Sequence, residues 1–116
     1  MSIRAERVGE EIRKVISERL VRGLKTPLPG FVTISGVEVS SDLGLAKIFF
    51  SVFGSEEECV GAAQVLEQEK RFLRQEVAKK VRLRLVPELM FVLDETPEKA
   101  ARIHELLGNL SSTKTA

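Results

Sequence analysis

The chain has 116 residues, of which 43% are hydrophobic and 30% charged, and its formal net charge is +1. This composition is typical of one folded domain with a single core and excludes a largely disordered chain. No apolar run approaches the roughly 18 residues that a membrane span requires, and the N-terminus lacks the apolar core of a signal peptide. Cys59 is the single cysteine, so no internal disulfide can form and a reducing cytoplasm is expected.

An amphipathic helix is predicted over residues 3–22, with Ser2 as its N-cap and Gly23 at its end. Its apolar positions recur at helical spacing: Val8, Ile12, Val15, Ile16 and Leu20. The residues assigned to its solvent face are Arg4, Arg7, Arg13, Lys14, Arg19 and Arg22. A mixed, solvated face explains this pattern better than a ligand does, because glutamates are interspersed among the cations.

Two strands are predicted after a proline-containing loop, over residues 31–40 and 45–53. In the first strand the apolar phase slips by one residue at Ser35-Gly36, which predicts a β-bulge there. In the second, Ala46, Ile48, Phe50 and Val52 share one face, while Lys47, Phe49, Ser51 and Phe53 share the other. Turn residues 41–44 join the two strands, so they are expected to pair as an antiparallel hairpin.

The next helical pattern runs for about 28 residues, which is long enough to predict a break near Glu69-Lys70-Arg71. Ser55 and Glu58 form a capping box at its start, and Pro87 ends the helical region. Residues 89–93 are continuously apolar and predict a short strand buried on both faces. A last helix is expected after Thr96-Pro97, with Ala100, Ile103, Leu106 and Leu107 facing inward and Gly108 ending it.

Residues 70–84 carry seven lysines or arginines against one glutamate, within a chain whose total charge is only +1. On the helix predicted here, Leu73, Val77 and Val81 stack on one side and face the core. The cations Arg71, Arg74, Lys79 and Arg82 lie within an arc of roughly 140° on another side. Such a face could bind a polyanion, but residues 56–69 hold five glutamates and no cation, and the helix dipole alone favours that arrangement.

No catalytic or metal-binding constellation is found in the sequence. His104 is the only histidine and is interpreted as a surface or boundary residue, and Cys59 as a small helix residue, so a four-ligand zinc site is excluded. Asp42, Asp94 and Glu95 are interpreted as turn and cap residues. No two glycines are three apart, which excludes a G-x-x-G loop, and neither a phosphate-binding loop nor a dinucleotide fingerprint is present. We therefore expect no enzyme, no metal and no cofactor.

The predicted order α-β-β-α-α-β-α indicates an α+β domain with a three-stranded sheet covered by helices. This order is similar to that of type II KH domains, an RNA-binding class, although the G-x-x-G loop between their central helices is absent here. We assign residues 1–110 to one KH-like domain and residues 111–116 to a flexible C-terminal tail.

Four stretches of the chain resemble the bacterial ribosome-binding factor A family. They are residues 7–12, residues 32–43, residues 46–54 and residues 72–91, of which the phrase from Leu83 to Phe91 is the most specific. The ending at residues 103–107 extends the resemblance to about residues 4–110. Many members place Ala-x-Gly at the kink between the central helices, where this chain has Glu69-Lys70-Arg71.

The resemblance implies a cytoplasmic, non-catalytic ribosome-assembly factor that is linked to growth in the cold. It implies binding to the small (30S) subunit and its 16S rRNA, and help in late maturation, including rRNA processing at the 5′ end. The expected RNA-binding residues are Lys70, Arg71, Arg74, Lys79, Lys80, Arg82 and Arg84, supported by Arg4, Arg7, Arg13 and Lys14. We expect a monomer when the protein is free. The alternatives are a protein-interaction module, in which acidic and basic segments pair between chains, and a factor that idles subunits in hibernation.

Overall fold

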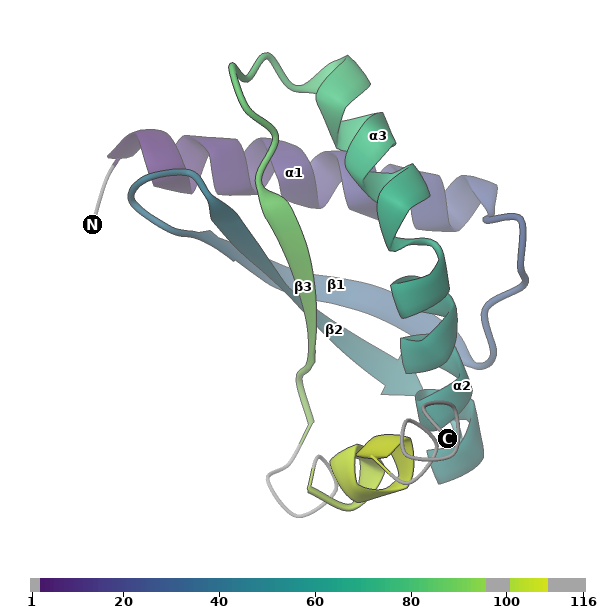
Figure 1. The fold of residues 1–116 in the computed structure, drawn as a ribbon. Coiled ribbons are helices and arrows are strands. Elements are labelled where there is room, and N and C mark those ends of the chain that lie inside the picture. The colour runs from purple at the N-terminus through teal and green to yellow at the C-terminus, as the bar shows by residue number, and fades with distance from the viewer. Residues whose placement is uncertain (1–2, 96–100, 109–116) are drawn as a thin grey trace, which may run out of the picture.

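The computed structural model describes residues 3–95 and 101–108. The elements follow one another as α1 (Ile3–Arg22), β1 (Phe31–Val39), β2 (Leu45–Phe53), α2 (Glu56–Gln68), α3 (Lys70–Lys80) and β3 (Glu88–Leu93). Residues 101–108 form a further helix that lies near α2 (Figure 1). The predicted order α-β-β-α-α-β-α is therefore confirmed. The expected cap at Thr96-Pro97, the N-cap Ser2 and the tail at residues 111–116 lie outside the described residues.

The three strands form one mixed sheet in the order β1-β2-β3. β1 and β2 are antiparallel, as the hairpin prediction required, and β2 and β3 are parallel. The register of the hairpin shifts between Ile34 and Gly36, which confirms the bulge predicted from the slipped apolar phase. β1 and β3 are the two edges of the sheet.

The core lies between one face of the sheet and the helices. Ala46, Ile48, Phe50 and Val52 of β2 are buried, as the alternation in the sequence predicted. Ile12 and Ile16 of α1 cover β1, and Leu66 of α2 and Leu73 and Val77 of α3 complete the same cluster. Gly9 allows α1 to approach the sheet closely, because a Cβ atom there would lie 3.0 Å from the carbonyl oxygen of Val37.

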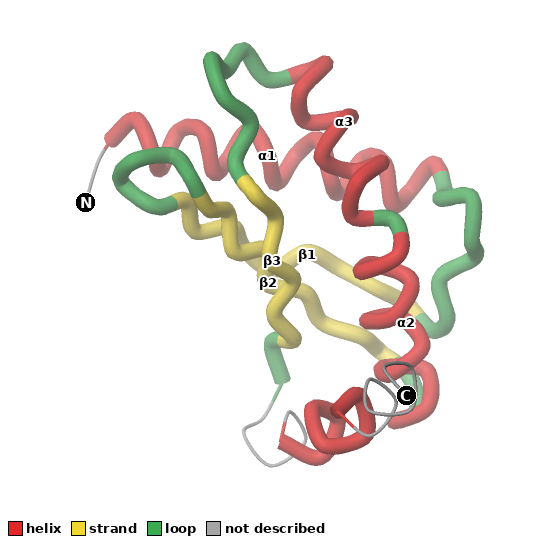
Figure 2. Tube along the Cα trace, in the orientation of Figure 1, coloured by secondary structure: helices red, strands yellow, loops and turns green. Residues whose placement is uncertain are grey.

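Two helices replace the single long helical pattern, with Glu69 at the joint (Figures 1 and 2). The capping box is present at the start of α2: Ser55 Oγ accepts from the Glu58 N–H, and Glu58 Oε1 accepts from the Ser55 N–H. The Glu69 side chain is 8% exposed and accepts a hydrogen bond from the Thr26 N–H, at 3.2 Å. The predicted break is confirmed, and a carboxylate bound to the α1–β1 loop occupies the place where a small residue was expected.

Two predictions about the C-terminal part of the chain are wrong. β3 is an edge strand rather than a strand buried on both faces: Leu89 and Leu93 are buried, whereas Met90 is exposed. Its continuous apolar sequence arises because the outer face of the sheet is itself partly apolar. In the last helix Ile103 is buried as predicted and Leu107 is half-buried, but Leu106 is exposed. Ala100 lies outside the described residues.

Candidate nucleic-acid interface

α3 ends at Lys80, four residues earlier than the basic stretch does. Val81 has extended backbone angles, φ −112° and ψ 126°, and is buried. Arg82 and Arg84 therefore lie on the loop that connects α3 to β3, and the prediction that Arg82 shares a helical face with Arg71, Arg74 and Lys79 is wrong. The loop projects beyond the sheet at the top of Figure 1, so its cations extend the surface of the last helical turn.

Arg74 fixes this loop to α3. Its Nη2 donates to the Val86 carbonyl at 2.7 Å and its Nε donates to the Pro87 carbonyl at 3.1 Å. A Glu88 carboxylate oxygen lies 3.6 Å from the same Nη2. Hydrogen bonds from a charged donor are among the stronger ones in proteins, so Arg74 holds the chain in place here. The sequence predicted a phosphate contact for Arg74, and that contact stays a prediction. In the structure the guanidinium donates to backbone carbonyls.

Five exposed cations lie on the loop between α3 and β3 or next to it, and we call the surface that they form the basic tip. Its members are Arg4, Lys79, Lys80, Arg82 and Arg84. Arg4 at the start of α1 and Arg84 line one surface hollow of about 440 Å³, together with Arg74. Two segments 80 residues apart in sequence thus contribute charge to one site. The acids that line the same hollow are Asp42 and Glu88.

Both acids at the tip are engaged by neighbouring groups. Asp42 Oδ1 accepts from Ser40 Oγ at 2.7 Å and from the Gly44 N–H at 2.9 Å. These two hydrogen bonds, that of Ser40 above all, lower the pKa of Asp42 below its usual value. Asp42 is thus a turn residue, as predicted, and Glu88 faces Arg74. Among the described residues, the tip therefore carries more positive than negative charge.

The other five predicted RNA-binding residues are not members of the basic tip. Lys70 is at the opposite end of α3 and forms an ion pair of 2.8 Å with Glu67. Arg71 lines a small hollow with Arg74 and Val86, next to the loop. Arg13 is half-buried and forms an ion pair of 3.2 Å with Glu10. Arg7 and Lys14 are exposed on α1, and Arg7 lies one helical turn from Arg4. The structure therefore brings part of the predicted set together at the tip, with Arg7 and Arg71 close to it and Lys70, Arg13 and Lys14 elsewhere on the helices.

One arginine of the predicted solvent face of α1 is turned inward. Arg19 Nη1 lies 3.3 Å from Glu76 Oε1, and its Cζ lies 5.5 Å from the centroid of the Phe72 ring. The two charged side chains are only 24% and 9% exposed, respectively. We call this contact between α1 and α3 the seam. Arg19 was assigned to solvent from the helical pattern, and that assignment is wrong.

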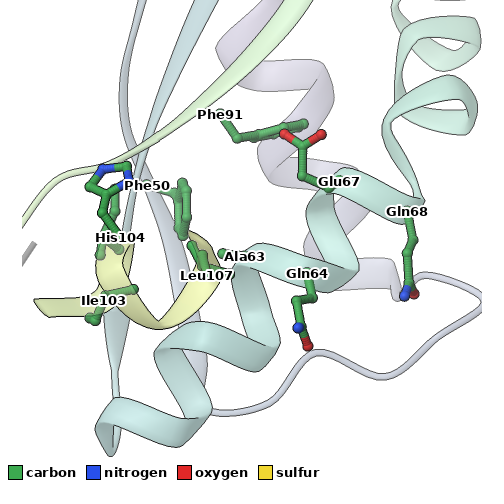
Figure 3. A pocket seen from close by; sticks show the side chains of 10 residues that line it. Phe50, Ala63, Gln64, Glu67, Gln68, Phe91, Ile103, His104 and Leu107 are labelled. Carbon is green, nitrogen blue, oxygen red and sulfur yellow. The ribbon is translucent and has the colours of Figure 1, made fainter. Parts of the chain in front are cut away.

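An apolar pocket of about 290 Å³ lies between α2, the sheet and residues 101–108 (Figure 3). Phe50, Phe91 and Leu107 supply much of its wall, and its titratable lining residues are Glu67 and His104. Glu67 is paired with Lys70, and His104 is exposed as predicted. In the described ranges 3–95 and 101–108, no group of His, Cys, Asp or Glu could hold a metal ion. The described side chains that line this pocket therefore form neither a catalytic nor a metal-binding site.

The sequence analysis missed an aromatic surface on the uncovered face of the sheet. Phe31 and Phe53 are cross-strand neighbours and are 68% and 85% exposed. The alternation of β2 had placed Phe49 and Phe53 on the face opposite the core, which was the available signal. No helix within the described residues is long and apolar enough to cross a membrane.

Comparisons with known proteins agree with this fold. The model of the family described as Ribosome-binding factor A matches residues 4–107. The chain is 50% identical to Ribosome-binding factor A of Brevibacillus brevis over 109 residues, which are 94% of this chain and 90% of that protein.

Two solved structures show the same arrangement. The solution structure of a Thermotoga maritima protein described as a putative ribosome binding factor A is 32% identical, with a TM-score of 0.70, and the match covers 84% of this chain and 93% of that one. The second is a homology model of Thermus thermophilus ribosome binding factor A, fitted into a cryo-EM map of a complex with the 30S subunit. It is 23% identical, with a TM-score of 0.62, and the match covers 76% of this chain and 92% of that one. Sequence, family model and fold agree that this chain belongs to the ribosome-binding factor A family.

Proposed function

We propose that this protein is a non-catalytic, cytoplasmic assembly factor that binds the 30S subunit through contacts of its basic tip with 16S rRNA. The observation that carries the proposal is the meeting of Arg4 and Arg84 at one hollow, on a loop that Arg74 immobilises. Lys79 and Lys80 end the helix that leads into this loop, and Arg82 lies on it. A positively charged patch on a fixed scaffold is what recognition of a folded phosphate backbone requires. Membership of a ribosome-binding family and the 30S complex of the Thermus protein support the choice of partner.

The proposed role extends to late maturation of the subunit, including 16S rRNA processing at the 5′ end. The protein acts as a monomer that recognises the charge and shape of the rRNA and catalyses no reaction on it. Pairing of acidic and basic segments between chains receives little support, because Glu67 and Glu56 have partners within the chain, Lys70 and Arg102.

Binding to purified small subunits over a range of salt concentrations tests the proposed interface. If about four phosphates are neutralised, the slope of log K against log salt should be near −3, at roughly 0.7 per phosphate for single strands. The double variant Arg82→Gln/Arg84→Gln should bind more weakly and should make the slope shallower by about 1.4–1.8, at about 0.7–0.9 per phosphate.

A matched control is the double variant Arg22→Gln/Lys25→Gln, which changes the net charge equally at two exposed residues near the other end of α1. It should retain the slope and nearly all of the affinity. Equal losses in the two variants would show that total charge, not the tip, governs binding. The maturation role is tested by replacing the chromosomal gene with the tip variant and measuring 16S precursors with unprocessed 5′ ends, which should accumulate. A subunit-idling factor would leave those precursors at the wild-type level.

A further inference from the structure

A large apolar side chain stands among the cations of the basic tip. Leu85 is 81% exposed and follows Arg84 directly on the loop between α3 and β3. Single exposed leucines are common on protein surfaces, so exposure alone carries no functional meaning. What distinguishes Leu85 is the combination of its charged neighbours with the way the loop is held.

The loop is anchored at several points close to Leu85. Pro87 is fully buried, and the partly buried Leu83 and Val86 pack against the hydrophobic core. Arg74 donates to the carbonyl oxygens of Val86 and Pro87, the two residues that follow Leu85. Leu83, Val86 and Pro87 point inward, so the loop exposes Arg82, Arg84 and Leu85 to solvent. Leu85 cannot move into the core unless the inward contacts are lost.

We propose that Leu85 inserts between neighbouring bases of the bound rRNA while Arg82 and Arg84 hold phosphates beside it. This inference rests on the proposed function and specifies how that same surface recognises its RNA. Apolar wedges flanked by arginine or lysine are a general means by which proteins unstack a base step. The bend so produced brings more of the backbone against the cations.

A rigid support is necessary for this role because unstacking a base step costs about a few kcal/mol. A wedge on a flexible loop would move aside, whereas one fixed by Arg74 and Pro87 transmits its contact to the RNA. The cost is lowest where stacking is already imperfect. The preferred target is therefore irregular RNA, at a bulge, a junction or a helix end, rather than a continuous A-form helix.

The variant Leu85→Ala tests the wedge in the full-length protein with purified small subunits. The variant loses the apolar contact that buries Leu85 in the complex with RNA, so it should bind roughly tenfold more weakly. The salt slope should be unchanged because no charge is altered. Leu85→Met retains a wedge of similar size and should bind within about twofold of the wild type. Val21→Ala serves as the matched control, since Val21 is 89% exposed at the far end of α1, and it should bind as the wild type does.

A second readout examines the RNA itself. Chemical probing of 16S rRNA in subunits saturated with wild-type protein should reveal a base step whose reactivity rises, and Leu85→Ala at saturation should abolish that rise. Unfolding in urea should be unaffected by Leu85→Ala, since the side chain is solvent-exposed.

The outcomes separate the wedge from the proposed function. If Leu85→Ala binds normally while Arg82→Gln/Arg84→Gln binds weakly, the wedge is overturned and rRNA binding by the tip stands. If Leu85→Ala binds weakly but the reactivity pattern at saturation is unchanged, Leu85 contacts a ribosomal protein and the wedge is likewise overturned. If the arginine variant also retains full affinity and slope, the proposed interface itself fails.

Discussion

The seam and the basic tip both contain arginine side chains, but the structure uses them in opposite ways. At the seam Arg19 is enclosed by Glu76 and by the ring of Phe72, so its charge is neutralised within the fold. At the tip Arg82 and Arg84 are exposed, and no side chain of residues 3–95 or 101–108 encloses them in this manner. A count of basic residues along the chain does not reveal this difference, because the partners come from distant segments. Only the contacts in the folded structure distinguish a charge that is paired inside the protein from one that faces solvent.

The largest effect on stability is expected at the seam. Glu76→Ala should reduce the free energy of unfolding by about 2–3 kcal/mol, since removal of one partner leaves the other charge poorly solvated. Arg19 Nε already lacks a hydrogen-bond partner within the described part of the chain, so the guanidinium has little alternative compensation. Urea denaturation measures the loss. Lys79→Ala is the control: Lys79 also approaches Glu76, at 3.9 Å, but is 74% exposed and should change stability by less than about 0.5 kcal/mol.

Arg74 stands between the two regions and should show an intermediate effect. Arg74→Ala removes two charge-assisted hydrogen bonds to carbonyl groups and should cost about 1–2 kcal/mol in unfolding free energy, reduced by the partial exposure of the side chain. It should also weaken subunit binding, because the loop that carries Arg82 and Arg84 is released. Unchanged stability with weaker binding would show instead that Arg74 contacts RNA directly, as the sequence analysis predicted.

Substitution at the tip itself should leave stability almost unchanged. Arg82→Gln/Arg84→Gln is expected to alter the free energy of unfolding by no more than about 0.5 kcal/mol, because both side chains are solvated. The same variant should lose subunit affinity, as described above. A marked loss of stability would contradict the distinction between the tip and the seam.

The smallest effect is a pH-dependent one at Asp42. Its pKa is lowered in the folded protein, so its ionised form contributes stability above its ordinary pKa of about 4, and the contribution disappears as the pH falls through the lowered folded pKa. Asp42→Asn should therefore be slightly less stable than the wild type at pH 7. The difference should vanish in acid, as measured by urea denaturation at several pH values. A difference in unfolding free energy that persists at pH 2 would show that the substitution acts through packing and not through the ionised carboxylate.

Local signals in the sequence were sufficient for most elements. The capping residues Ser55 and Glu58 located the start of α2, and the slipped phase at Ser35-Gly36 located the bulge. Both features depend on residues close together in the chain, for which the backbone geometry is nearly determined by residue type. The excessive length of the central helical pattern similarly revealed the joint at Glu69.

Features that depend on distant contacts were not accessible in this way. Val81 continues the apolar stripe of Leu73 and Val77, so the pattern extended α3 past its true end at Lys80. The loop geometry is stabilised by hydrogen bonds from Arg74 to residues 12 and 13 positions further on, which periodicity does not encode. For the same reason the basic stretch was correctly identified as cationic, while the placement of Arg19, Arg74 and Arg84 required the folded structure.

The bulge in β1 also bears on how copies of this protein behave together. β1 is an edge of the sheet, and an uninterrupted nine-residue edge would offer a template for pairing with another chain. The shift between Ile34 and Gly36 divides that edge into two segments of four paired residues, Phe31 to Ile34 and Gly36 to Val39. Each is too short to recruit a neighbouring strand efficiently, so the irregularity protects an aromatic, partly uncovered sheet against edge-to-edge aggregation.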